Sequence, residues 1–222
     1  MKKLCALLVL LLPWPLRRRL LAWLWKYELH PTSRIGLSLV LADRLELAAG
    51  ARIGHGNVIK GLALVRIAEH GLIGNLNWIT GFPLGLRTRH FAHQPERRPE
   101  LHIGAHAAVT HRHMIDCTHR VEIGAFSIFA GFRSQILTHS IDLTQSRQHS
   151  EPITIGAYCF VGTGCVLLGG AALPDRSVLG ALSLLNKAHV EPGQLYAGVP
   201  ARPVVSLPAD ARFFSRAEGY ID

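Results

Sequence analysis

The chain has 222 residues, 49% of them hydrophobic, so it is long and apolar enough to bury the core of one domain. Its four cysteines include no CxxC pair, which argues against a cysteine metal site and fits reduced thiols in a cytosolic compartment. The formal net charge is +9, and it is concentrated in residues 1–34. Nucleic-acid-binding proteins instead spread basic residues over a groove-sized face, so no nucleic-acid partner is expected.

Residues 1–34 form a basic, tryptophan-rich segment with two apolar runs, at 4–12 and 20–25. Neither run reaches the roughly 18 residues of a membrane-spanning helix. No small-x-small cleavage site of a secretory signal peptide precedes the arginines at 17–19. Tryptophans beside basic residues are typical of an amphipathic segment at an anionic lipid surface. The segment is therefore predicted to be membrane-proximal, which would make the protein cytoplasmic and peripheral at the inner face of the membrane. The alternative is a helix that packs on the core and caps it.

From Ile35 onward, large apolar residues recur at every sixth position, with two shifts of two residues and two interruptions. The next position is often glycine or alanine, which suits a tight corner beside an inward-pointing residue. Only one position in this frame is polar. The positions are Ile35, Leu41, Leu47, Ile53, Ile59, Ile67, Ile73, Ile79, Ile103, Val109, Ile115, Ile123, Phe129, Gln135, Ile155, Val161, Leu167, Leu173, Leu179 and Leu185.

A helix would repeat its apolar face every three or four residues and a half-buried strand every two, so a period of six excludes both as the organising rule. It predicts a solenoid, in which three hexads make a triangular coil and stacked coils share a continuous core. The expected fold class is all-β, a parallel β-helix over residues 35–205 with a short helical N-terminal segment. Residues 206–222 are expected to be a C-terminal tail.

Two insertions interrupt the coils, at residues 80–102 and 140–154. Both are rich in polar and charged residues, which places them on the surface, and the inserted loops of a solenoid commonly build its binding face. They are predicted to select the molecule that the protein binds. The alternative is that they are tolerated insertions without consequence.

The chain has 13 histidines, many of them in the middle of the predicted coils. Most are expected to be structural, because a corner histidine is more often hydrogen-bonded than catalytic. His139 differs from the others, because it lies where the third hexad of a coil gives way to the second insertion. That junction is expected to be open to solvent and to a neighbouring subunit.

Three stretches carry a resemblance to a known family: THSID at 138–142, PITIGAYCFVGTGCVLLGGAALPDRSVLGALSLLNK at 152–187 and YAGVPARPV at 196–204. They resemble the hexapeptide-repeat acyltransferases, particularly sugar and exopolysaccharide O-acetyltransferases of the nodulation, galactoside and colanic acid biosynthesis type. The resemblance implies a left-handed winding and a homotrimer. It also implies that a histidine just before the return to the coils deprotonates the acceptor hydroxyl, and His139 matches that histidine by position.

An orienting carboxylate is expected to hold the tautomer of such a base and to stabilise its protonated form. Asp116 lies one coil before His139 in the predicted stack, and Asp142 lies three residues after it, so both are candidates. Asp116 has the alternative role of a corner residue that hydrogen-bonds its own backbone. His113 and His119 are candidates for contacts with an acceptor sugar, or they simply line the coils.

The resemblance further implies a donor site for acetyl-CoA, without a metal, in a groove between subunits near the C-terminal coils. Residues 180–187 and 198–202 match the family's donor motifs, in which backbone donors and basic side chains suit anionic phosphates. The implied donor-binding residues are Gly162, Gly180, Ala181, Ser183, Lys187, Gly198, Pro200 and Arg202. Phe160, Leu182 and Asn186 depart from the family's usual residues, which leaves the acyl chain of the donor open.

Two other functions are weighed against this one. A γ-class carbonic anhydrase would need three zinc-binding histidines, two of them five residues apart. His106 and His111 have that spacing, but they precede His139 and lack the flanking glycines of that family. A non-catalytic scaffold would not need the donor motif. The sequence therefore predicts an acetyl-CoA-dependent O-acyltransferase of polysaccharide biosynthesis, with a sugar hydroxyl of a cell-envelope or exopolysaccharide precursor as acceptor.

Overall fold

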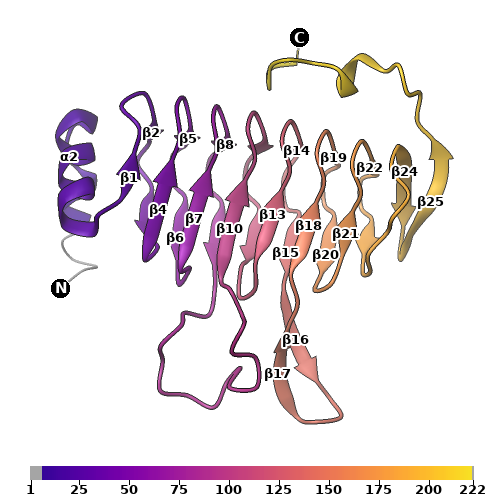
Figure 1. The fold of residues 1–222 in the computed structure, drawn as a ribbon, viewed down its shortest axis with the longest axis horizontal. Coiled ribbons are helices and arrows are strands. Elements are labelled where there is room, and N and C mark those ends of the chain that lie inside the picture. The colour runs from indigo at the N-terminus through magenta and orange to yellow at the C-terminus, as the bar shows by residue number, and fades with distance from the viewer. Residues whose placement is uncertain (1–6, 222) are drawn as a thin grey trace.

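The computed structural model describes residues 7–221, and most of them wind into a left-handed parallel β-helix (Figure 1). Each coil contributes one strand to each of three sheets, and neighbouring coils pair in parallel. The fold class predicted from the six-residue period and the resemblance is confirmed. Its physical basis is that one coil cannot bury its aliphatic side chains, whereas stacked coils bury them against one another.

Each sheet runs the length of the solenoid, one strand per coil. The first sheet contains β1 (Glu28–Leu29), β4 (Arg44–Leu47), β7 (Leu64–Ile67), β10 (Glu100–Ile103), β13 (Val121–Ile123), β18 (Ile153–Ile155) and β21 (Ala172–Leu173). The second contains β2 (Arg34–Ile35), β5 (Arg52–Ile53), β8 (Leu72–Ile73), β11 (Ala108–Val109), β14 (Ile128–Phe129), β19 (Phe160–Val161), β22 (Val178–Leu179), β24 (Gln194–Gly198) and β25 (Ala201–Ser206). The third contains β3 (Leu39–Leu41), β6 (Val58–Lys60), β9 (Trp78–Thr80), β12 (Met114–Asp116), β15 (Gln135–Leu137), β20 (Val166–Leu168) and β23 (Leu184–Leu185).

The core lies inside the triangle formed by the three sheets. All positions of the predicted frame are buried except Leu41 and Gln135, where the prediction was wrong by one residue. Val40 and Ile136 are buried in their place. The corner that precedes Val40 is one residue shorter than the repeat, and the corner that precedes Ile136 is one residue longer, so the spacing of six fails at these two strands.

Helix α2 (Trp14–Trp25) lies across the N-terminal end of the solenoid (Figure 1). Its Arg17 is buried and donates hydrogen bonds to the backbone carbonyls of Ile35 and Gly36 in the first coil. Three apolar side chains of the helix pack against the core, namely Trp14, Leu21 and Trp25. This face of α2 therefore covers the open end of the core, as the alternative prediction for this segment expected.

The other face of α2 is exposed and carries Leu16, Arg19 and Trp23. No helix in residues 7–221 is long and apolar enough to cross a membrane. The basic residues Lys2 and Lys3, which contribute to the predicted membrane-proximal segment, lie outside the described residues.

The two insertions leave the solenoid at the same corner, between the third and first sheets, and project from one side of it (Figure 1). Residues 81–99 connect β9 to β10 without a regular strand or helix. The second insertion is an antiparallel hairpin of β16 (His139–Asp142) and β17 (Arg147–Ser150). The interruptions of the period located both insertions, but the period could not predict their internal structure, since neither contributes to the coil repeat.

The C-terminal end is closed by the antiparallel pair β24–β25, after which residues 207–221, with the 3-10 turn η1 (Arg212–Phe214), run back along the coils (Figure 1). Arg216 of this tail lies over the rings of Phe126 and Tyr158 and donates a hydrogen bond to the carbonyl of Phe126. Those rings belong to a stack with His106, with centroids 4.9 and 4.7 Å apart. The tail therefore fastens several coils to one another along the corner between the first and second sheets.

Candidate active site

His139 and Asp116 meet at the corner from which the insertions project. Asp116 ends β12, and the parallel register pairs it with Leu137, two residues before His139. The Nδ1 atom of His139 lies 2.8 Å from Oδ2 of Asp116. Because an ionised carboxylate can only accept, Nδ1 carries the proton and Nε2 is left with its lone pair. Asp142, the other predicted carboxylate, instead lies 3.4 Å from Arg147 across the hairpin and accepts a hydrogen bond from the Gln145 amide.

The carboxylate of Asp116 is buried and held by two threonines as well as by His139. Oδ1 accepts from the amide and hydroxyl of Thr118 at 3.2 and 2.6 Å, and Oδ2 accepts from the amide and hydroxyl of Thr138 at 3.0 and 2.7 Å. The predicted alternative, in which this corner carboxylate binds its own backbone, is therefore also realised. These contacts fix the carboxylate in the orientation that receives the imidazole.

The environment of the pair favours the charged form of the Asp116 carboxylate and makes the His139 imidazole more basic. Burial alone would raise the pKa of Asp116, but the hydrogen bonds from His139, Thr118 and Thr138 lower it below its usual value. The hydrogen bond to Asp116 raises the pKa of His139 and outweighs the effect of partial burial. His139 is thus a stronger base than a free imidazole and still accessible, since its side chain is 43% exposed.

His139 opens into a cavity of about 290 Å³ that the first insertion covers. Phe82 and Phe91 of this insertion line the cavity, and the ring of Phe91 stands edge-on to the imidazole at 6.4 Å. Arg97 is buried beneath both rings and donates hydrogen bonds of 2.7 Å to the carbonyls of Phe82 and Thr118. The insertion is therefore anchored to the coil that carries Asp116.

The two insertions are also joined to each other. The side-chain amide of Gln94 donates to the carbonyl of Ser150 at 2.8 Å and accepts from the Ser150 backbone amide at 2.9 Å. Gln148 of the hairpin completes the lining of the His139 cavity. Sequence analysis missed these cavity residues, because they stand outside the repeat and only their position in a polar insertion pointed to them.

The structure separates the two remaining predicted histidines. His113 is almost fully buried at a different corner, between the second and third sheets, where its Nε2 lies 3.0 Å from the Thr110 hydroxyl and its Nδ1 accepts from the Ser134 amide. Burial lowers its pKa to about 4, so it is a neutral structural residue, and its predicted contact with an acceptor is corrected. His119 lies at the same corner as His139, where its Nδ1 accepts from the Arg120 amide, but it does not line the His139 cavity.

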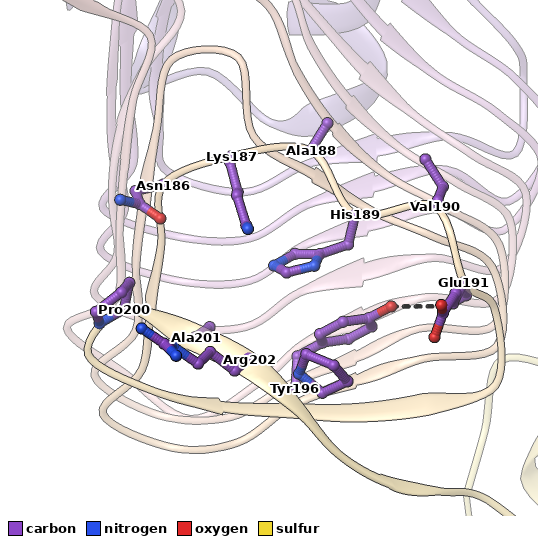
Figure 2. Close-up of a pocket in the computed structure, with 11 residues that line it drawn as sticks. Asn186, Lys187, Ala188, His189, Val190, Glu191, Tyr196, Pro200, Ala201 and Arg202 are labelled. Atoms are coloured by element: carbon purple, nitrogen blue, oxygen red, sulfur yellow. Dashed lines mark hydrogen bonds between the residues drawn. The ribbon is translucent and has the colours of Figure 1, made fainter.

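Three of the predicted donor residues, Lys187, Pro200 and Arg202, line one cavity of about 730 Å³ at the C-terminal end of the solenoid (Figure 2). His189 and Tyr196 form its floor, with ring centroids 4.3 Å apart, and the Tyr196 hydroxyl donates to the carbonyl of Glu191. The side chains of Lys187 and Arg202 are exposed there. Two cationic groups beside an aromatic floor suit an anionic ligand with a planar part.

The other predicted donor residues lie outside this cavity, at the corner between the second and third sheets. They are Gly162, Gly180, Ala181 and Ser183, and Gly198 caps them by donating its amide to the Ser183 hydroxyl at 3.1 Å. A Cβ atom at Gly162 would lie 2.7 Å from the Ala181 amide, so this corner needs glycine for coil packing. The structure therefore divides the predicted set between the C-terminal cavity and the corner between the second and third sheets.

Lys187 shares its corner with His139. The parallel register aligns Leu137 with Leu168, and Leu167 with Leu185, so the residues that follow these strands stack above one another. Two coil steps separate His139 from Lys187, a distance of about 10 Å along the axis. The coil between them turns at Gly169 and Gly170, and the side chain of Glu151 lies over both: a Cβ atom at Gly170 would lie 2.8 Å from the Glu151 carboxylate.

The residues that the structure describes contain no cluster of histidine, cysteine, aspartate or glutamate able to hold a metal. His106 and His111, which have the spacing of a zinc pair, lie at different corners. His106 stacks on the ring of Phe126 at the corner between the first and second sheets. Nδ1 of His111 accepts a hydrogen bond from the Asn75 amide at the corner between the second and third sheets.

No known family model matches the chain, and no curated protein matches it in sequence. Among solved structures, the polysialic acid O-acetyltransferase OatWY shares the fold with a TM-score of 0.60, at 16% identity over 81% of this chain and 84% of that one. The hexapeptide-repeat acetyltransferase VCA0836 from Vibrio cholerae is 28% identical over 49% of this chain, with a TM-score of 0.46. The chain covers 63% of the length of VCA0836. The structural neighbours are thus hexapeptide-repeat acetyltransferases.

Proposed function

We propose that this protein is an O-acyltransferase of polysaccharide biosynthesis, which moves an acetyl group from acetyl-CoA to a saccharide hydroxyl of a cell-envelope or exopolysaccharide precursor. The observation that carries the proposal is the His139–Asp116 pair, which lies in a cavity beneath two insertions on a β-helix. The shared fold with a polysialic acid O-acetyltransferase supports the saccharide acceptor, and the resemblance of the sequence to sugar O-acetyltransferases supports the same reaction.

His139 is the general base of the proposed reaction. Its Nε2 takes the proton of the acceptor hydroxyl as the oxygen forms a bond to the thioester carbonyl carbon, and the resulting imidazolium is stabilised by Asp116. When the carbon–sulfur bond breaks, the same nitrogen returns the proton to the thiolate of CoA. Asp116 keeps the proton on Nδ1 throughout, which leaves Nε2 free for both transfers.

Acetyl-CoA is proposed to bind along the corner that joins Lys187 to His139. Lys187 and Arg202 would neutralise phosphates of the donor at the C-terminal cavity. An extended arm of the donor that reaches toward His139 would pass Gly169 and Gly170 and displace the exposed side chain of Glu151 that lies over them. The donor supplies an activated thioester, and the residues of this chain bind it, orient it and move the proton.

Steady-state kinetics of the full-length protein test both roles. Acetyl-CoA is incubated with saccharide acceptors, and thiol release and acetylated product are measured together. His139→Ala should lower kcat about 10²–10⁴-fold at nearly unchanged affinity for acetyl-CoA. Lys187→Ala and Arg202→Ala should mainly raise KM for acetyl-CoA, whereas Arg44→Ala, in the N-terminal coils, should not. Retention of most acyl transfer by His139→Ala would contradict the proposed mechanism.

A homotrimer is part of the proposal. The outward face of the first sheet is charged, with Glu46, Arg66 and Glu122, whereas the third sheet exposes Trp78 and Met114 side by side. Exposed apolar side chains in adjacent coils are typical of a surface that another subunit covers. Trp78→Lys should shift the mass measured by light scattering from trimer to monomer. A trimeric mass for this variant would argue against the third sheet as the interface.

Membrane attachment through α2 is also proposed, with the protein cytoplasmic and peripheral at the inner face. The exposed Leu16 and Trp23 flank Arg19 on the outward face, an arrangement suited to an anionic lipid surface. Leu16→Ser with Trp23→Ser should reduce co-sedimentation with anionic vesicles without unfolding the core, and added salt should weaken binding of the unchanged protein. Leu143→Ser at the hairpin tip is the control, since Leu143 is even more exposed than Leu16 and Trp23 but far from α2. Equal vesicle binding by the unchanged protein, the Leu16→Ser/Trp23→Ser variant and the Leu143→Ser control would reject attachment through α2.

A further inference from the structure

The cavity that contains His139 adjoins a second cavity, which lies between the two insertions. The second cavity has a volume of about 740 Å³, and His90, Phe91 and Gln148 line both cavities. Because these residues line both, the two cavities adjoin, and together they are called the cleft below, with the His139–Asp116 pair at one end and the tips of the insertions at the other. A space of this size admits a ligand larger than one sugar ring.

The outer part of this cleft is basic. Arg89 and His93 from the first insertion and Arg147 from the hairpin line it, and none of the described residues that line this part is acidic. Arg147 has one carboxylate nearby, Asp142 at 3.4 Å, but Asp142 does not line the cavity. Desolvation chiefly lowers the pKa of His93, and the charges of Arg147 and His149 lower it further against the opposite effect of Asp142.

The basic lining is not explained by the fold. Arg97, in the same insertion, is buried and holds the insertion to the coil, but Arg89 makes no ion pair with any described residue and is exposed. Guanidinium groups match carboxylates and phosphates with paired hydrogen bonds. Two of them, contributed by separate insertions to one cleft, would grip an anionic group from both sides.

We infer that the acceptor is an anionic saccharide, bound with a carboxylate or phosphate between Arg89 and Arg147 while a hydroxyl of a nearby sugar unit reaches His139. This inference rests on the proposed function and narrows its acceptor to one class. Selection occurs because the acidic ligand gains charge-assisted hydrogen bonds from Arg89 and Arg147 in the outer part of the cleft, and the neutral analogue does not.

Calorimetry on the full-length protein tests the inference separately from catalysis. The probes are oligogalacturonate and oligosialic acid, each compared with its own methyl ester, and glucose 1-phosphate compared with methyl glucoside. At least one acidic probe should bind about tenfold or more tightly than its neutral counterpart, and the difference should shrink between about 0.05 and 0.5 M NaCl. The carboxylate and phosphate pairs separate the two sources of charge.

Arg89→Gln and Arg147→Gln should each remove most of that preference. Arg98→Gln is the control, because Arg98 is an exposed arginine of the same insertion that does not line the cleft, and it should keep the preference. Equal affinity for acidic and neutral probes, or a preference that survives both substitutions in the cleft, would overturn the inference. Acetyl transfer to a neutral saccharide alone would overturn it while leaving the proposed reaction in place, and absence of transfer to every saccharide would count against the reaction.

Discussion

The substitution Asp116→Asn tests the candidate site most directly, because the carboxylate accepts five hydrogen bonds and an amide cannot accept them all. Oδ1 receives two from Thr118, and Oδ2 receives two from Thr138 and one from His139. An asparagine has one accepting oxygen and one donating nitrogen. Whichever way it is placed, its NH₂ group must face at least one buried backbone amide that now has an acceptor.

The two placements have different costs. If the NH₂ group faces His139, Nδ1 must accept and Nε2 carries the proton, so the imidazole can no longer act as a base. A catalytic histidine in the wrong tautomer loses about 10²–10⁴-fold in kcat. If the NH₂ group faces Thr118 instead, the tautomer survives. In either placement one buried backbone amide, that of Thr138 or that of Thr118, loses its acceptor, which costs about 1–3 kcal/mol of unfolding free energy. Residual activity should also extend to lower pH, since loss of the carboxylate lowers the pKa of His139 that Asp116 raises.

The assay is kcat for acetyl transfer as a function of pH at saturating substrates, combined with urea unfolding of the same protein. The activity of the unchanged protein should fall as pH drops through the raised pKa of His139, because the base is then protonated. Asp142→Asn is the control and should keep kcat within about twofold, since its ion pair with Arg147 is exposed. Asp116→Asn with more than about a tenth of kcat, an unmoved acidic limb and unchanged stability would refute the assigned role.

Three further predictions concern the fold. Ile123→Asp should prevent folding, as judged by loss of the cooperative thermal transition and of the assembled mass, because it buries an unpaired carboxylate in the coil core; a folded assembly of normal mass would contradict the coil frame. The unchanged protein should lose roughly 3 kcal/mol of unfolding free energy as the pH falls from 6.5 to about 4, and His113→Asn should abolish this loss. The pKa of His113 is lower in the folded protein, so the unfolded chain binds more protons as the pH falls and the folded state is destabilised. Asparagine is chosen because it continues the row formed by Asn57 and Asn77. An identical acid transition in both proteins would exclude His113 as its cause. Arg216→Ala should lower unfolding free energy by about 1–2 kcal/mol and accelerate proteolysis of the tail, because the guanidinium lies over three aromatic rings; an unchanged cleavage rate would show that the tail is held by other contacts.

The coil core could be predicted from the sequence because, in a solenoid, residues that pack together are separated by a nearly constant number of residues along the chain. Each inward residue contacts its counterpart one coil away, so a fixed period along the chain is also a set of contacts in space. The frame failed at Leu41 and Gln135 because corner length, and not hydrophobicity, sets the phase of the next strand. Nothing in the composition of those corners marks the missing or extra residue.

The sequence by itself determined the repeat, the position of the insertions and the placement of His139 at a junction. It could not choose between Asp116 and Asp142, because that choice depends on which carboxylate the parallel register brings beside the imidazole. Asp116 is 23 residues away along the chain and 2.8 Å away in space, whereas Asp142 turns into the hairpin.

The tertiary structure alone decided how the cleft is built. Phe91, Arg97 and Arg89 follow no period, since an insertion makes its contacts with one particular coil and with the other insertion instead of with a repeated neighbour. Pairing between Gln94 and Ser150 joins the two insertions across 56 residues. Such contacts depend on the path of the whole chain, which is why residues that no sequence pattern had indicated lie together around His139.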